Sequence, residues 1–338
     1  MKKILLITLL LLSGMVLRAV EVEQNRQNLT YSLPMTEGEV KVEYDRVVFT
    51  QGVFWQYAER YLGKVDVITE NSEYYELKSV SLRTRAVADE QKTFELPAAK
   101  SLPHIRLNGK GLLVAVGDID VPATKAKDVQ PAAEPEKKKC AMLSPLTEEQ
   151  LRTGSMAKMA ENTAKMIYRI REDRLNLMTG ETEAADGEAL KTMLRKLEQT
   201  EHQLTELFTG TRKVEHHSAA LPLNVAQDAS EAVLFRFSRY SGVVDADDLA
   251  GEPVYCDVTT RGVAYSEVKK TTKPVKGALY YNQPGAANVK ITYRGAVLIE
   301  QRIDVAQLGV VRPLPLMVLK SGHGVLLNTS TGAIKEIR

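Results

Sequence analysis

The feature that most constrains the fold is a helical stretch from Thr147 to Gly210, which lies between two segments of β periodicity. It opens with the capping-box sequence Thr147-Glu148-Glu149-Gln150. Its apolar residues then recur at steps of three and four, which places them on one face of a helix. A second amphipathic run follows Gly180. Two long helices joined by a short polar connection predict an antiparallel helical hairpin over 147–210.

The first twenty residues have the form of a secretory signal. Lys2 and Lys3 precede an apolar run from Ile4 to Leu12, and Ala19 is a small residue suited to cleavage. A bilayer-spanning helix takes about 20 apolar residues, and neither this run nor any later one reaches that length. We therefore expect residues 1–19 to be a signal peptide, with a retained interfacial anchor as the alternative. The mature chain is then exported, has no transmembrane span, and is periplasmic, outer-membrane-associated or extracellular.

Charge argues against nucleic acid as a partner. The formal net charge is only +2, from 45 basic and 43 acidic residues. A nucleic-acid binder carries a basic face, and no such clustering is visible along the chain. Lys137-Lys138-Lys139 lies within 122–146, where Ala, Lys, Glu and Pro dominate and hydrophobic periodicity disappears. This composition predicts an extended linker.

The segments on both sides of the linker and helices show a period of two, which is typical of half-buried strands. In 20–121, for example, Val40, Val42 and Tyr44 alternate with charged residues, and a short helix is predicted near 53–62, ended by Gly63. In 211–338 several short runs are separated by turns. Frequent short strands of this kind predict a sandwich or barrel-like domain.

The predicted fold class is therefore α+β, with two β-rich domains flanking a long antiparallel helical hairpin. A mature chain of about 320 residues exceeds what one hydrophobic core usually serves, so several domains are expected. The predicted order is signal peptide 1–19, N-terminal β-rich domain 20–121, linker 122–146, hairpin 147–210 and C-terminal β-rich domain 211–338.

Three aromatic residues on the short helix are the candidates for a ligand site. Trp55, Tyr57 and Tyr61 follow one another closely, and with Phe54 they could form a platform on which a sugar ring stacks. Aromatic residues at helical spacing are more often part of a core. Both readings remain open on the sequence.

Asp245, Asp247 and Asp248 are the best candidates for a cation site. Their segment begins like an EF-hand loop, but Leu249 replaces the oxygen ligand at the fifth loop position and Ala250 replaces the glycine at the sixth. A solvated turn is therefore the stronger interpretation. We expect no metal and no other cofactor.

The chain has two cysteines, Cys140 and Cys256. Two cysteines do not form a disulfide scaffold. In an oxidising compartment they could pair and attach the linker to the C-terminal domain. The alternative is two unpaired thiols.

No catalytic residue is predicted. The sequence contains no HExxH, no GxSxG and no glycine-rich phosphate loop. Paired carboxylates remain open, because the two acids of a glycosidase are set by their distance in space rather than in sequence. Whether the protein is an enzyme is thus left open, and the sequence favours a negative answer.

Several segments together resemble one known family. They are Leu33-Pro34, GVFWQYAERYLG (52–63), GSMAKMAENTAKMIYRIREDRLNLMTGE (154–181), DDLAGEPVY (247–255) and VAQLGVVRPLP (305–315). The chain resembles, from about 29 to 337, an uncharacterised exported Bacteroidetes family known as domain-of-unknown-function family 4831. The resemblance implies export, a Bacteroidetes origin and a β–α–β organisation. It implies no activity, cofactor or site residue.

The function expected from the sequence is that of a non-enzymatic cell-envelope or extracellular protein, with a binding or structural role towards a protein or glycan partner. The alternative is a carbohydrate-active enzyme or a glycan-binding accessory protein. A third hypothesis is oligomerisation through the helical hairpin.

Overall fold

The computed structural model describes residues 29–96, 104–117, 119, 154–179, 187–263, 278–315 and 324–337. The predicted signal peptide, the predicted linker, the capping box at Thr147 and Cys140 lie outside these residues. Within them, strands predominate and form three antiparallel sheets, so the β-rich character predicted from the sequence is confirmed.

The first sheet is a long three-stranded ribbon. Its strands, in spatial order, are β2 (Ser72–Leu96), β1 (Leu29–Thr50) and β5 (Thr211–Leu223). Val40 and Val42 are fully buried, as their alternation with charged residues predicts. The central strand β1 is paired on both sides, with Val42 opposite Val80 of β2 and Ala219 of β5. A strand that precedes the helices is therefore hydrogen-bonded to a strand that follows them.

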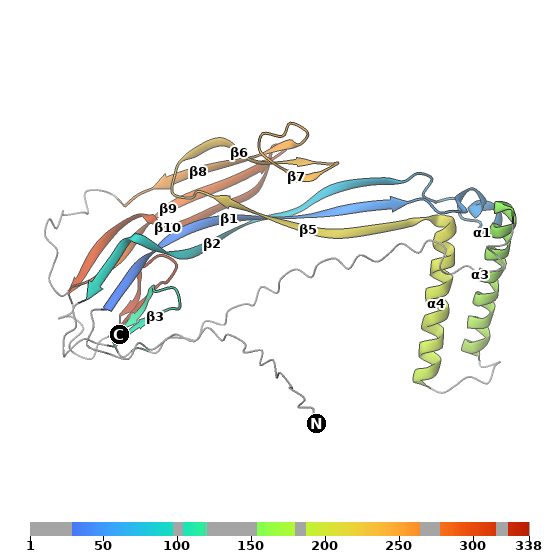
Figure 1. Cartoon of the computed structure of the whole chain (residues 1–338), viewed down its shortest axis with the longest axis horizontal. Helices are drawn as coiled ribbons and strands as arrows, with labels where there is room; N and C mark the ends of the chain where they lie inside the picture. Colours follow the sequence, from blue (N-terminus) through green and yellow to red (C-terminus); the bar gives the residue numbers. More distant parts are fainter. Residues whose placement is uncertain are drawn as a thin grey trace, which may run out of the picture.

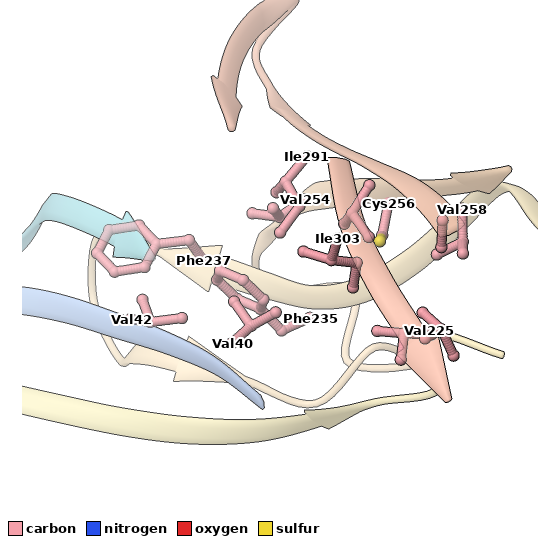
Figure 2. Packing of buried hydrophobic residues seen from close by; sticks show 13 residues of the cluster. Val40, Val42, Val225, Phe235, Phe237, Val254, Cys256, Val258, Ile291 and Ile303 are labelled. Carbon is pink, nitrogen blue, oxygen red and sulfur yellow. The ribbon is translucent and has the colours of Figure 1, made fainter. Parts of the chain in front are cut away.

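The second sheet packs against one face of this ribbon. It consists, in spatial order, of β10 (Ala296–Pro315), β9 (Ala278–Tyr293), β8 (Glu252–Arg261), β6 (Ala229–Ser238) and β7 (Gly242–Val244). Figure 2 shows Val40 and Val42 facing Phe235 and Phe237 across this interface. Burying side chains of this size stabilises the fold by about 1.5–3 kcal/mol each.

The third sheet is small and again combines distant parts of the chain. Its strands are β12 (Ile334–Ile337), β11 (Val325–Leu327), β4 (Leu113–Val116) and β3 (Ile105–Leu107). It covers a second core that includes Tyr31 and Leu33 of β1. The β segments before and after the helices thus share two of the three sheets, an interleaving that the sequence analysis did not predict. We call the three sheets with these two cores the β body.

The helices form a separate cluster at the far end of the ribbon (Figure 1). They are η1 (Trp55–Tyr57), α1 (Ala58–Leu62), α3 (Met156–Thr179) and α4 (Glu188–Thr209). Their shared core contains Phe54, Ala58, Ile167, Leu204 and Phe208. We call this cluster the helical head. The part of the ribbon that joins it to the β body is the arm, formed by residues 46–50 of β1, 72–75 of β2 and 211–215 of β5.

Within the stretch predicted over 147–210 the structure describes two separate helices, α3 and α4, and it does not show the long antiparallel hairpin that the sequence predicts. Burial is confined to one end, where Ala160, Ala164 and Ile167 of α3 meet the last turns of α4. Farther from this core, Leu175 and Met178 are exposed, Met178 by 67%. The reason is that only the end beside α1 has a third element to complete its core.

Candidate functional site

The candidate site is a cleft of about 390 Å³ between the edge of β2 and the second sheet. Its size is in the range of small-molecule sites. We call it the tyrosine–arginine cleft. Four lining residues come from β2, two from the end of β6 and the turn that follows it, and two from the end of β9 and the turn that follows it: Tyr74, Tyr75, Glu76, Leu77, Phe237, Arg239, Tyr293 and Arg294.

A close backbone approach holds the two sheets together at this cleft. The Tyr75 N–H donates to the Arg239 carbonyl at 2.7 Å, which fastens the edge of β2 to the turn between β6 and β7. Gly242, at φ +75°, makes the approach possible, because a Cβ there would lie 2.9 Å from the Tyr44 ring. The position of the cleft therefore depends on a glycine in the left-handed region.

Aromatic contacts extend from the floor of the cleft into the core. The Phe237 ring meets the Tyr293 ring edge-on at 6.3 Å between centroids, and the Tyr44 ring at 6.0 Å. Such edge-to-face pairs contribute about 0.5–1.5 kcal/mol beyond area burial. Burial also raises the pKa of Tyr293 above its ordinary value. The rings are thus held in fixed orientations before any ligand arrives.

Arg294 occupies an unusual backbone position beside the cleft. Arg294 and Gly295 form the two-residue turn between β9 and β10, with φ of +51° and +77°. Such turns favour Asn or Gly at the first position, and a left-handed conformation costs other residues roughly 1–2 kcal/mol. The Arg294 guanidinium lies 5.1 Å from the centre of the Tyr293 ring and is paired with Glu252, with Nη2 donating to Oε1 at 2.7 Å. This hydrogen bond lowers the pKa of Glu252.

Arg239 differs from the other charged residues of the cleft. Its guanidinium carbon lies 5.0 Å from the centre of the Tyr74 ring, and it makes no ion pair with any residue that the structure describes. Glu76, by contrast, is paired with Lys78 at 2.9 Å. Since Arg294 is also paired, Arg239 contributes a positive charge that no described side chain neutralises.

A second cleft, of about 440 Å³, lies at the other end of the ribbon around Thr36 and Gln307. Gln307 and Thr36 satisfy each other there through two hydrogen bonds, at 3.0 and 2.7 Å. Of its three charged residues, Glu37 and Arg85 form an ion pair at 2.7 Å, and the third is Glu39. None of its lining residues is aromatic, so it offers a ligand no ring face of the kind that the tyrosine–arginine cleft provides.

One further polar pair was not predicted. The carboxylate of Asp45, only 7% exposed, lies 2.6 Å from Nδ1 of His216, whose side chain is 84% exposed. Lys78 Nζ is 3.7 Å from the other oxygen of Asp45. The neighbouring His217 points to the opposite face and stacks on Tyr44 at 5.5 Å. The β1–β5 register places Asp45 opposite His216, and nothing in the local sequence of either strand indicates this pairing.

With this geometry described, the chain can be compared with known proteins. The profile of the family described as Domain of unknown function (DUF4831) matches residues 27–335. The chain belongs to that family. No curated protein and no solved structure matches it. Among the described helices of this DUF4831 chain, none is long and apolar enough to cross a membrane.

The aromatic residues predicted as a ligand platform lie in the helical head, away from the tyrosine–arginine cleft. Trp55 is half-buried in η1. Tyr57 and Tyr61 stack on each other at 6.1 Å and pack against the core of the head. The hydroxyl of Tyr168 donates to the Tyr61 carbonyl at 2.9 Å. Their packing fits the core reading, and glycan binding by them stays a prediction.

The aspartates predicted as cation ligands lie in an exposed turn between β7 and β8. The Asp248 N–H donates to the Asp245 carbonyl at 3.2 Å, and Asp248 Oδ1 accepts from the Ala250 N–H at 2.9 Å. Asp247 is exposed in the same turn. Within the described ranges, no three acidic, histidine or cysteine side chains are grouped so that they could hold a metal ion.

Cys256 is buried in the core between the ribbon and the second sheet (Figure 2). Burial raises the pKa of its thiol to about 11. Because its presumed partner Cys140 lies outside the described residues, the disulfide stays a prediction. A bridge would have to reach a sulfur that the core now encloses.

No residue of the tyrosine–arginine cleft was predicted from the sequence as a site residue. One local signal was available, because Tyr293-Arg294-Gly295 places an arginine where a tight turn favours Asn or Gly. Arg239 carries no comparable signal. It joins the cleft only through the pairing of Tyr75 with the turn after β6.

Proposed function

We propose that this DUF4831 protein is an exported, non-enzymatic binding protein whose ligand site is the tyrosine–arginine cleft. The observation that carries the proposal is the gathering of tyrosine rings and guanidinium groups from three separate strand ends. Rings provide apolar faces, and guanidinium groups provide directed hydrogen-bond donors. A concave surface with a few converging polar groups is the usual form of a ligand site.

The chemistry of the cleft favours binding over catalysis. A glycosidase needs two carboxyl groups roughly 5–9.5 Å apart. Among the described lining residues, Glu76 is the one that carries a carboxylate, and this carboxylate is paired with Lys78. Arg294 is likewise held by Glu252. These two ion pairs hold the walls of the cleft in position. They leave the lining without a pair of carboxyl groups that could donate and accept a proton.

The location that we propose is the periplasm, the outer membrane or the extracellular space. The support for this location is the sequence of residues 1–19. Lys2 and Lys3 precede an apolar run there, and Ala19, farther along, is a small residue suited to cleavage. Mass spectrometry of the secreted or periplasmic protein would show a mature N-terminus at residue 20. A chain that retains Met1 in the cytoplasmic fraction would contradict this.

For the helical head we propose that α3 and α4 form an antiparallel hairpin through which copies of the chain associate. Glu201 of α4 supports the hairpin, because it pairs with Arg171 and Arg174 of α3 at 2.6 and 2.9 Å. Exposed apolar residues such as Met178 and Met193 support the association. A strictly monomeric mass by light scattering would contradict association.

The test of the main proposal combines a broad hydrolase screen with a glycan array. We expect no turnover in the hydrolase screen. On the glycan array we expect binding that is weakened by Tyr293→Ala and is unchanged in the matched head variant Tyr57→Ala. Asp45→Asn removes the one buried carboxylate of the described residues. Reproducible turnover that this change abolishes would overturn the non-enzymatic assignment.

The second candidate is a glycan-binding accessory protein or a carbohydrate-active enzyme. The specific observation in its favour is that two tyrosines from different strands, Tyr74 of β2 and Tyr293 of β9, line the same cleft. A blank glycan array would contradict this candidate. It would leave a protein or peptide ligand for the cleft.

A further inference from the structure

We infer that the tyrosine–arginine cleft is selective for acidic saccharides, with Arg239 binding the carboxylate of a uronate-type sugar. This inference rests on the proposed function, since it names the ligand class of the same cleft. Four observations support it: the charge that the cleft leaves unpaired, the position of Arg239, the backbone of Arg294, and the hydrogen bonding of the β2 edge.

Charge gives the sign of the ligand. Three charged side chains line the cleft. Glu76 is paired with Lys78, and Arg294 with Glu252. Arg239 is then left as a cation without a described counter-charge. An anionic group on the ligand would supply that counter-charge, and a neutral ligand would not.

The position of Arg239 suits an oxyanion. The guanidinium carbon lies 5.0 Å from the centre of the Tyr74 ring, and the Arg239 carbonyl accepts from the Tyr75 N–H. A guanidinium presents its N–H donors as a fixed fork, and this fork matches the two oxygens of a carboxylate.

The backbone of Arg294 supports a binding role for this part of the lining. Its left-handed φ of +51° is retained although the position favours Asn or Gly. Strain of this kind is concentrated at ligand sites. The Arg294–Glu252 pair holds the turn in place, so the Tyr293 ring is presented to the cleft at a fixed angle.

The edge of β2 favours a saccharide over a peptide. Extended peptides commonly bind by adding a strand to a sheet edge through main-chain hydrogen bonds. At this cleft the Tyr75 N–H is already bonded to the Arg239 carbonyl at 2.7 Å. What the lining offers instead is ring faces and side-chain donors, against which a sugar ring can pack.

The test is isothermal titration of the full mature chain with tri-galacturonate, with a neutral trisaccharide of the same length, and with a glutamate hexapeptide. We expect the acidic trisaccharide to bind at least ten-fold more tightly than either of the others. Its binding should weaken as salt is raised, because the contact is ionic. Arg239→Gln should reduce the affinity about ten-fold or more, and Arg239→Lys by less, since it keeps the charge and loses the fork.

Arg212→Gln is the matched control. Arg212 also lies over an aromatic ring, that of Phe49 at 5.9 Å, but it does not line the cleft. We expect this variant to bind as the parent does. Circular dichroism and the thermal midpoint establish that both variants are folded.

Three outcomes would overturn the inference. They are absence of tri-galacturonate binding, an equal loss of affinity in the Arg239 and Arg212 variants, and tighter binding of the acidic peptide. Neutral-sugar binding that Arg239→Gln leaves unchanged would also overturn the acidic selectivity. In that last case the proposed binding function would stand, because Tyr293→Ala would still weaken the neutral ligand.

Discussion

Gly52 and Gly210 are in direct backbone contact where the arm meets the helical head. A Cβ added to Gly52 would lie 2.9 Å from the Gly210 nitrogen, and one added to Gly210 would lie 3.2 Å from the Gly52 nitrogen. The Phe54 N–H also donates to the Leu207 carbonyl at 2.7 Å. The end of β1 and the end of α4 are therefore fastened together, and this contact sets the orientation of the head.

The first prediction concerns Gly210→Ala. Gly210 has φ +79°, and a Cβ there would lie 2.4 Å from the Thr50 carbonyl. Its backbone conformation, φ +79° with ψ −180°, is essentially restricted to glycine and costs other residues about 1–3 kcal/mol, and overpacking costs about 1–3 kcal/mol, so we expect a loss of roughly 2–6 kcal/mol. Urea unfolding, followed by circular dichroism, measures this.

Two glycines separate these causes. Gly63 has φ +65° with nothing within 4 Å of its Cβ position, so Gly63→Ala tests a positive φ without crowding. Gly52 has no left-handed φ, and Gly52→Ala tests crowding alone. We expect Gly63→Ala to be the mildest of the three changes. A Gly210→Ala loss no greater than that of Gly63→Ala would contradict the packed junction.

The second prediction concerns Glu201→Gln. Glu201 is 14% exposed and joins α4 to Arg171 and Arg174 of α3. Because both guanidinium groups are about one-third exposed, solvent screens the pairs, and we expect a loss of only about 1 kcal/mol that shrinks in high salt. Hydrogen exchange should show reduced protection in α3 and α4 together.

Glu161→Gln is the control for this prediction. Glu161 pairs with Lys158 and Lys165 within α3, and these lysines lower its pKa to about 2. Its removal should change exchange in α3 and leave α4 as it was. Equal effects of the two variants on α4 would refute the cross-helix role of Glu201.

The third prediction concerns Tyr31, which joins β1 to β9. Its hydroxyl donates to the Tyr280 carbonyl at 3.2 Å and accepts from the Tyr280 N–H at 2.7 Å. Tyr31→Phe leaves both main-chain groups without this partner, so we expect a loss of about 1–3 kcal/mol in urea unfolding at neutral pH. Tyr240→Phe, at a side chain that is 79% exposed, should be neutral.

Tyr31 also gives a pH dependence. Burial raises its pKa from 10.0 to about 12. Because the folded pKa lies above the unfolded value, the contribution to stability is complete below about pH 10 and is lost as pH rises towards 12. The parent protein should therefore lose more stability over this range than Tyr31→Phe. Parallel curves for the two proteins would refute the assignment.

The fourth prediction concerns Cys256, studied in a Cys140→Ser background so that one thiol reports. Burial raises its pKa from 9.0 to about 11, and only the thiolate reacts rapidly with disulfide reagents. We expect slow labelling of the folded protein at pH 8–9 and rapid labelling in urea. The same raised pKa means that stability from this group is lost as pH rises from about 9 to 11.

The parent chain extends this test to the predicted disulfide. If Cys140 and Cys256 pair, the denatured parent shows no titratable thiol until a reductant is added. If they do not, it shows both thiols at once. Rapid labelling of folded Cys140→Ser would instead show that Cys256 is accessible and contradict its buried position.

The sequence predicted local structure well where burial is one-sided. Alternation around Val40 and Val42 indicated a half-buried strand, and both side chains are buried. The sequence of β2 also indicates an irregularity in that strand, because the alternation of its apolar residues shifts by one position between Leu77 and Val80. The structure has a register shift there, between the partners of Glu43 and Tyr44. An inserted residue produces both effects.

Long-range pairing could not be predicted. Asp45 and His216 are 171 positions apart, and their contact depends on which strand β5 joins and in which register. The tyrosine–arginine cleft is similar, since Arg239 and Arg294 reach it from turns that follow different strands. No local periodicity specifies such partners. The long hairpin predicted over 147–210 rested on local periodicity, which indicates the apolar face of a helix but not what covers that face.

The ribbon also determines how the molecule responds to force. β1 is hydrogen-bonded on one side to β2 and on the other to β5, and all three strands run through the arm to the head. Antiparallel hydrogen bonds lie perpendicular to the strands. A pull on the head along the arm is therefore carried by three continuous chains side by side, and the hydrogen bonds between these chains keep them from separating sideways.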